Sequence, residues 1–209
     1  MTGADFKADL HTYLQDARDV LVWKLEGLSE YDIRRPLTPT GTNLLGLVKH
    51  LAGAEAWYFG AAFGRPFDGA PRLWFTGDTE PNGDLWARAD ETREELVGVY
   101  QRIQTHSDET IAALPLDAVG RLPVDPPKEI TLHRVLTHMV AETQRHAGHA
   151  DIVRELIDGA TGQRVNGANM APGDAEARAE HRDRVERAAG SRASATTGST
   201  SSPSAPPPG

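Results

Sequence analysis

The sequence predicts an all-α protein: an up-down four-helix bundle followed by an extra C-terminal helix and a disordered tail. Four long segments carry apolar residues at three- and four-residue steps, and stretches rich in proline and glycine separate them. After Gly159 the composition changes to charged residues and then to Ser, Thr and Pro. We expect a bundle domain over residues 1–162, a linker with an appended helix over 163–190, and a disordered tail over 191–209.

Composition and charge argue against nucleic acids and membranes as binding partners. The 209 residues fit a single core, and a net charge of -8 without a basic stripe argues against a nucleic-acid partner. No apolar run reaches the roughly 18 residues of a membrane span. The polar, acidic N-terminus is unlike a signal peptide, so we expect no membrane partner and a cytoplasmic location. The absence of cysteine means that any thiol chemistry needs an external thiol.

The first two helices differ in how much of their surface is apolar. Residues 4–27 place one apolar stripe opposite charged side chains, as in a helix with one buried face. The second helix begins after a proline-rich joint, with Thr40 or Thr42 as its cap, and reaches about Phe63. It is apolar on most sides, which predicts packing against more than one neighbour.

A long connection separates the second helix from the third. Residues 64–89 carry Gly, Pro, Asn and Asp at turn spacings and are expected to cross one end of the bundle. The third helix is predicted over Asp90–Leu114, where Pro115 ends it. In the following proline-rich stretch, residues 121–124 are expected to pair briefly as an edge strand.

The fourth helix, Thr131–Gly159, carries titratable groups on its apolar face. On a helical wheel, Val135 and Val153 lie within about 20° of Glu142, so this carboxylate points toward the core. Buried charges must be paired or bound to a metal, because an unpaired one costs several kcal/mol. The same stripe carries three histidines: His138, His146 and His149.

The spacing of these residues predicts a metal site. Glu142 and His146 are one helical turn apart, so both can reach one ion, and His50 of the second helix also faces packed surface. His50, Glu142 and His146 are therefore our predicted ligands for a divalent ion, with zinc first and iron, manganese or nickel as alternatives. Three ligands leave positions open for catalysis, whereas His149 or His138 as a fourth ligand would make the site structural.

Two segments carry a resemblance to a known family. NLLGLVKHLAGAEAWYFG in the second helix and HMVAETQRHAGHADIVRELIDG in the fourth resemble the DinB-like superfamily of helical bundles. Within it, the chain resembles the actinobacterial branch related to mycothiol-dependent maleylpyruvate isomerase, over roughly residues 5–190. The resemblance implies the same three ligands, with His149 outside the ligand set. It also implies S-transfer, isomerisation or thiol-assisted elimination with mycothiol, bacillithiol or glutathione.

We therefore expect a metal-dependent enzyme that activates a low-molecular-weight thiol, with mycothiol as the first choice. The thiol would be transferred to a small electrophilic substrate or would assist its isomerisation. His149 and His138 are the expected proton carriers. Arg145 and Arg154 are expected to bind carboxylates of the thiol or substrate, with surface salt bridges as the alternative. The protein would act as a monomer or homodimer.

Two other functions fit the same residues. A metal-dependent hydrolase would use metal-bound hydroxide in place of the thiolate, with the same three ligands. A non-catalytic stress-response bundle would either bind the metal without catalysis or need the inward histidines only to satisfy each other.

Overall fold

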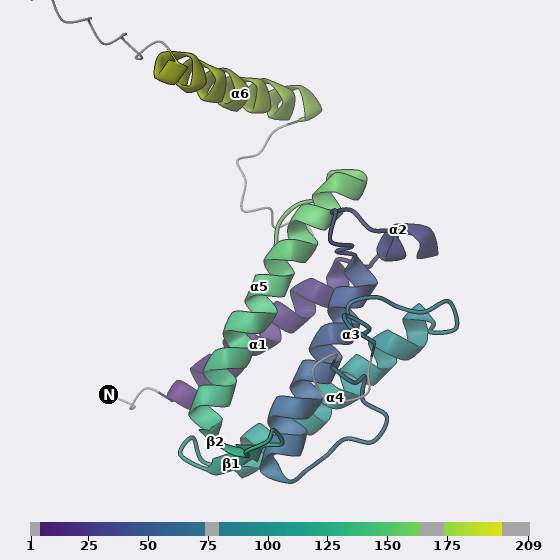
Figure 1. The fold of residues 1–209 in the computed structure, drawn as a ribbon, viewed down its shortest axis with the longest axis vertical. Helices are drawn as coiled ribbons and strands as arrows, with labels where there is room; N and C mark the ends of the chain where they lie inside the picture. Colours follow the sequence, from purple (N-terminus) through teal and green to yellow (C-terminus); the bar gives the residue numbers. More distant parts are fainter. Residues whose placement is uncertain (1–4, 74–79, 164–173, 198–209) are drawn as a thin grey trace, which may run out of the picture. The chain divides into compact units, whose positions relative to one another are not determined.

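The computed structural model describes residues 5–73, 80–163 and 174–197 (Figure 1). The chain divides into two compact units, residues 1–169 and 170–209. The second unit contains one helix, α6 (Ala175–Thr197), in its described part. This helix extends beyond residue 190 into the stretch expected to be disordered, and residues 198–209 lie outside the described residues.

The first unit is a four-helix bundle, which confirms the predicted fold class. The four long helices are α1 (Phe6–Trp23), α3 (Leu44–Glu55), α4 (Arg93–Ala113) and α5 (Leu132–Asp158). Helix α1 packs against α5 and α3 packs against α4, while α3 also contacts α5 (Figure 1). Burial of the apolar stripes between these helices drives their association. Fully buried core residues include Leu14, Leu45, Leu51, Phe59, Ile103, Val135, Leu136 and Met139.

Capping side chains set the helix ends. Helix α5 has the predicted caps: the Thr131 side chain accepts the Arg134 N–H, and Gly159 adopts a left-handed φ of 76°. For α3 the prediction was wrong, because Asn43 rather than Thr40 or Thr42 is the N-cap. Helix α4 begins at Arg93 after a capping box of Thr92 and Glu95, later than the predicted Asp90.

Several short elements join the helices. A short helix, α2 (Glu30–Arg34), lies in the joint between α1 and α3. Strand β1 (Val119–Leu122) pairs antiparallel with β2 (Lys128–Thr131), so the predicted edge strand is part of a hairpin that leads directly into α5.

The second bundle helix changes its hydrogen-bonding pattern before it ends. After Glu55 it continues as one π-helical turn, η1 (Ala56–Gly60), and then as a 3-10 turn, η2 (Ala61–Phe63). The total extent matches the predicted end at Phe63, but the wider turn changes which side chains face α5.

Glycines let the described parts of the connection 64–89 lie directly on α3 and η1. A Cβ atom at Gly46 would overlap the Leu85 carbonyl, and one at Gly53 would lie 2.6 Å from the Pro71 carbonyl oxygen. Two hydrogen bonds also hold the end of the connection against α3. Asn43 Nδ2 donates to the Leu85 carbonyl at 3.1 Å, and Lys49 Nζ donates to the Trp86 carbonyl at 3.1 Å.

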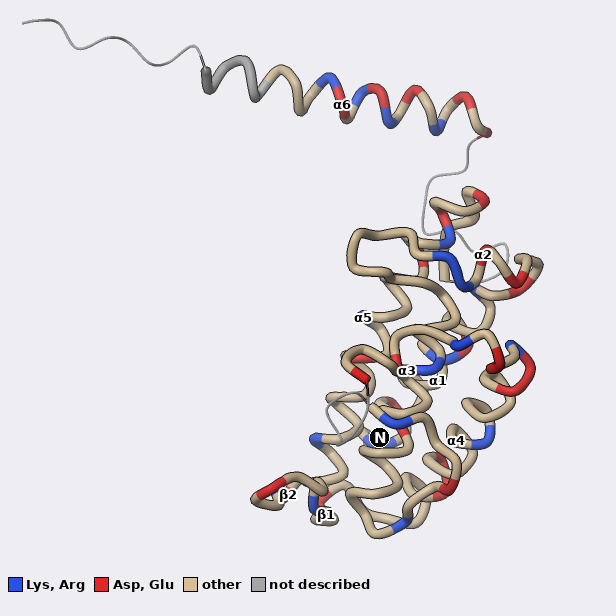
Figure 2. The backbone as a smooth tube through the Cα atoms, turned by 45° about the vertical axis from the view of Figure 1, so that its right-hand side comes forward, with Lys and Arg blue, Asp and Glu red and all other residues tan. Residues whose placement is uncertain are grey.

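Charged residues of both signs are interspersed along the bundle (Figure 2). Within the described part of the chain, no helix is both long and apolar enough to cross a membrane.

Candidate metal centre

Three side chains from two helices converge inside the bundle. His50 comes from α3, and Glu142 and His146 come from α5, and one ligand atom of each lies within 4.8 Å of the others. Glu142 Oε1 is 3.0 Å from His146 Nε2 and 3.5 Å from His50 Nε2. The structure thus brings together the three residues that the sequence singled out as ligands.

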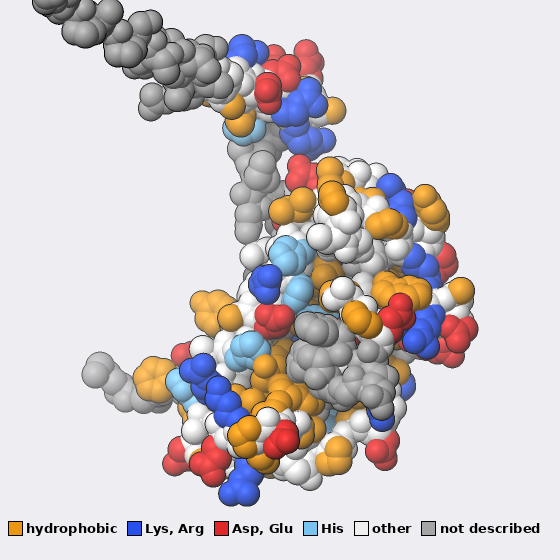
Figure 3. Space-filling model, in the orientation of Figure 1, with side chains coloured by type: hydrophobic (Ala, Val, Ile, Leu, Met, Phe, Trp, Pro, Cys, Tyr) orange, Lys and Arg blue, Asp and Glu red, His pale blue; other side chains and the backbone are white. Residues whose placement is uncertain are grey.

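The cluster is partly accessible. The His50 and Glu142 side chains are 13% and 22% exposed, whereas His146 is buried. Histidine side chains are visible along the face of α5, next to apolar side chains (Figure 3). His50 and Glu142 are therefore in contact with solvent.

A fourth residue, Asp84, holds His50 in place. Its carboxylate is fully buried, and Oδ2 lies 2.7 Å from His50 Nδ1. A carboxylate there can accept the Nδ1–H, so that Nε2, 3.5 Å from Glu142 Oε1, is the nitrogen directed at the cluster, the usual arrangement for a metal-binding histidine. Sequence reasoning missed Asp84, whose only local signal is the Asn82–Gly83 turn that precedes it.

Electrostatics favour a charged carboxylate in the cluster. Hydrogen bonds from His146 and His50 hold the pKa of Glu142 far below its usual value, against the opposing effect of partial burial. Burial lowers the pKa of His50, but hydrogen bonds to Glu142 and Asp84 outweigh it, so the pKa is raised overall. Glu142 is therefore ionised at neutral pH, as a metal ligand must be.

The two predicted proton carriers occupy different positions. His149 is half-buried, and its Nδ1 lies 3.4 Å from His146 Nδ1. Burial and the charges of His146 and Arg145 lower the pKa of His149, so it is neutral at pH 7. His138 does not share the buried stripe as expected. It is exposed at the edge of the stripe, and its ring centroid lies 4.6 Å from that of Tyr58.

The two predicted arginines also differ. Arg145 is 67% exposed, with Nη1 at 4.0 Å from Glu142 Oε2. Arg154 lies three turns further along α5, about 18 Å from Glu142 by helical rise. Its buried guanidinium pairs with Asp158 and donates to the carbonyls of Lys24 and Glu26. These bonds join the C-terminal ends of α1 and α5, so we do not assign Arg154 to thiol binding.

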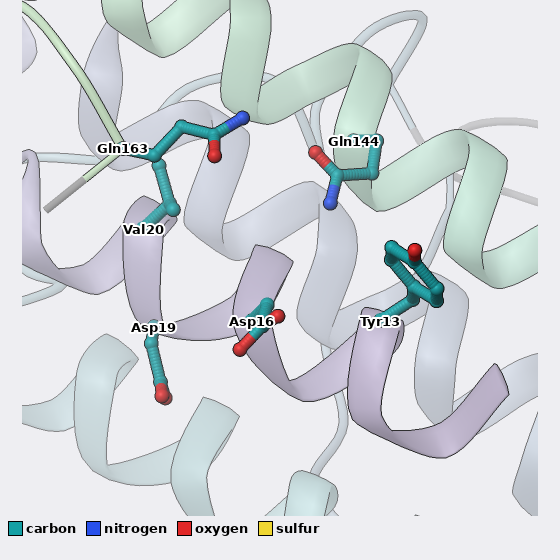
Figure 4. A pocket seen from close by; sticks show the side chains of 6 residues that line it. All are labelled: Tyr13, Asp16, Asp19, Val20, Gln144 and Gln163. Atoms are coloured by element: carbon teal, nitrogen blue, oxygen red, sulfur yellow. The ribbon is translucent and has the colours of Figure 1, made fainter. Parts of the chain in front are cut away.

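A separate hollow of about 240 Å³ lies between α1 and α5 (Figure 4). It includes Gln144, which points about 160° away from Glu142 around α5, so the hollow is on the other side of the helix. Its lining residues are Tyr13, Asp16, Asp19, Val20, Gln144 and Gln163.

The donor set of the cluster fits a divalent metal ion. Two imidazole nitrogens and one carboxylate oxygen suit zinc, iron, manganese or nickel, and a buried carboxylate orients one of the imidazoles. Fold and cluster together define a four-helix bundle with a three-ligand candidate metal centre.

Comparison with known proteins assigns the family. The family model described as mycothiol-S-transferase matches residues 9–159, and the chain belongs to this family. This membership confirms the resemblance inferred from the sequence. None of the curated proteins matches. Among solved structures, the crystal structure of a conserved protein from Enterococcus faecalis has a TM-score of 0.56 at 15% identity. That likeness covers 76% of this chain and 100% of the other, and it shows the fold alone.

Proposed function

We propose that this protein is a metal-dependent enzyme that transfers mycothiol to a small electrophile or uses mycothiol to isomerise it. The observation that carries the proposal is the convergence of His50, Glu142 and His146, with Asp84 on the far side of His50. Family membership supports mycothiol as the thiol.

His50, Glu142 and His146 would hold the ion, with zinc as the first choice. When bound, the ion supplies the positive charge that lowers the pKa of a thiol, which suits a chain without cysteine of its own. Asp84 keeps His50 Nε2 directed at the cluster. Burial of His146 and Asp84 keeps water away from one side of the centre.

The surrounding residues would handle protons and orientation. His149 is neutral and half-buried next to His146, so it can accept the proton of an incoming thiol. His138 is exposed and can exchange protons with solvent. Arg145, exposed beside Glu142, can contact an anionic group of the substrate.

Conversion of an electrophile tests the proposal. Full-length protein without a polyhistidine tag is analysed for bound metal and then incubated with 1-chloro-2,4-dinitrobenzene and mycothiol, glutathione or no thiol. We expect stoichiometric divalent metal and conversion that depends on mycothiol. Thiol-independent hydrolysis of an ester or amide would favour the hydrolase instead. Absence of bound metal, with no loss of stability on chelation, would favour the non-catalytic bundle.

A matched pair of histidine variants ties the function to the cluster. His146→Ala removes a ligand, so we expect loss of bound metal and at least a 100-fold loss of conversion, in line with the roughly 10- to 100-fold effect of orienting residues alone. The control is His133→Ala, on the same helix but exposed. Metal content and melting temperature with and without chelator are the measurements. Equal effects of the two substitutions would contradict the assignment.

A further inference from the structure

The π-helical turn η1 changes which side chain follows His50 on the face toward α5. On a regular α-helix, Tyr58 would lie about 80° from His50 around the axis. The residues of η1 are bonded five apart and so turn roughly 80° each, which reduces the separation to about 30°. The wider turn therefore brings Tyr58 toward the face that carries the candidate metal centre.

The contacts of Tyr58 agree with this rotation. Its ring centroid lies 4.6 Å from that of His138, which is one helical turn before Glu142 on α5. Its ring also lies 4.8 Å from that of Trp57, in an edge-on arrangement. The side chain is half-buried, and no residue that the structure describes takes its hydroxyl as a hydrogen-bond donor. Among those residues, this phenol therefore stands beside His138 with its donor available to a ligand.

We propose that Tyr58 donates a hydrogen bond, and then a proton, to an oxygen of the electrophile next to the candidate metal centre. This inference rests on the proposed function and names its substrate class: epoxides and α,β-unsaturated carbonyl compounds, in which charge develops on oxygen as sulfur attacks carbon. Alkyl and aryl halides, which release a halide ion, need no such donor.

The proton and electron balance is simple for an epoxide. The mycothiol sulfur forms a C–S bond, and the C–O bond breaks with its electron pair going to oxygen. That oxygen takes the proton of the Tyr58 hydroxyl. The phenolate then regains, through solvent, the thiol proton that His149 accepted, so no net proton is gained or lost. The product is a β-hydroxy thioether.

The surroundings of Tyr58 favour the protonated hydroxyl, which is the form that can donate a hydrogen bond. Burial, and then the negative charge of Glu142, raise the pKa of Tyr58. The phenol is therefore protonated at neutral pH and can act as a donor, as hydroxyl groups do in sites that stabilise an oxyanion.

Binding of two product analogues tests the hydrogen bond without turnover. The probes are S-(2-hydroxyethyl)mycothiol and S-ethylmycothiol, titrated calorimetrically into the full-length protein. We expect the wild type to bind the hydroxyl compound about 5- to 10-fold more tightly, as one hydrogen bond allows. Tyr58→Phe should bind both with equal affinity, because it keeps the ring contacts and lacks only the hydroxyl. Tyr13→Phe, an exposed tyrosine on α1, is the control and should behave as wild type.

Turnover of two substrates gives the second readout. Tyr58→Phe should lower kcat for an epoxide by about 100-fold, the usual size of general acid catalysis, and leave kcat for a primary alkyl bromide within twofold. Bound metal and melting temperature should equal those of the wild type. Equal losses on both substrates, or none on either, would overturn the assignment. A wild type that binds neither analogue and converts neither substrate would instead show that the proposed function fails, and the role of Tyr58 would fall with it.

Discussion

At the scale of single residues, Asp84 and His50 form the pair that prepares the candidate metal centre. An imidazole can present either nitrogen, and its partner decides which one is free. Because Asp84 is fully buried and lies 2.7 Å from Nδ1, the ring has one favoured orientation before any ion binds. The His50 ring then loses less conformational freedom when a metal ion binds, which favours metal affinity.

The variant Asp84→Asn tests this orientation. The amide keeps the shape of the side chain but removes the charge that fixes the His50 tautomer, so we expect metal affinity to fall about 10- to 100-fold. Competition with a chromogenic zinc chelator measures the affinity. The control is Asp90→Asn, an exposed residue of the same region, which should have no effect. Equal affinities for wild type and Asp84→Asn would contradict a positioning role.

The Arg154–Asp158 pair makes a prediction about acid stability. Hydrogen bonds from Arg154 lower the pKa of Asp158. The ionised carboxylate is therefore favoured in the folded state, and this stabilisation is present above pH of about 4 and is lost as the pH falls through the lowered pKa. Asp158→Asn should be less stable than wild type in urea at pH 7, and the difference should shrink below pH of about 4. A difference that does not change with pH would contradict the pairing.

At the scale of elements, the close contact between α3 and the connection 64–89 is what delivers Asp84 to His50. Gly46 lies one turn before His50, and it leaves room for the Leu85 carbonyl, next to Asp84 in the chain. Helix packing and site geometry are thus coupled through a single missing methyl group.

Replacing this glycine should affect both stability and metal binding. Gly46→Ala would force the Leu85 backbone away from α3, so we expect a loss of about 1–3 kcal/mol in unfolding free energy, together with weaker metal binding. In contrast, a Cβ atom at Gly148 of α5 meets nothing within 4 Å. Gly148→Ala should therefore stabilise by up to about 1 kcal/mol, as an exposed helix position allows. Denaturant unfolding measures both, and a stabilised Gly46→Ala would show that the connection does not need the close approach.

At the scale of the whole molecule, the first unit ends with contacts that secure the chain after α5. The buried Lys24 donates from Nζ to the Gly162 carbonyl at 2.7 Å and pairs with Asp151, which also accepts the Gly162 N–H at 3.0 Å. A bundle that stands alone should therefore need residues somewhat beyond Gly159.

Two truncations test this boundary. A chain ending at residue 169 should keep the melting temperature and metal affinity of the full chain, because it retains the first unit. A chain ending at Gly159 leaves the Lys24 ammonium without the Gly162 carbonyl, so we expect a loss of about 1.5–3 kcal/mol, the range for a hydrogen bond to a charged group. Equal melting temperatures for the two truncations would contradict a stabilising role for this contact.

Much of the bundle and three residues of the candidate site were predictable from the sequence. Helical periodicity is a local signal, and it placed four long helices and showed that Glu142 lies on a buried stripe. One-turn spacing paired Glu142 with His146. Thr131 and Gly159 defined the ends of the last helix because capping depends on one residue and its immediate neighbours.

The remaining parts depend on contacts that no local pattern encodes. Asp84 is 34 positions from His50 in the chain, within an irregular connection, so only the packing of that connection on α3 brings them together. The π-helical turn places Tyr58 beside His138, where ideal helical spacing would point it elsewhere. The sequence alone therefore determined the helices and the ligand types, because these follow from short-range periodicity. The tertiary structure decided which side chains orient the ligands and face the centre, because that depends on contacts between distant segments.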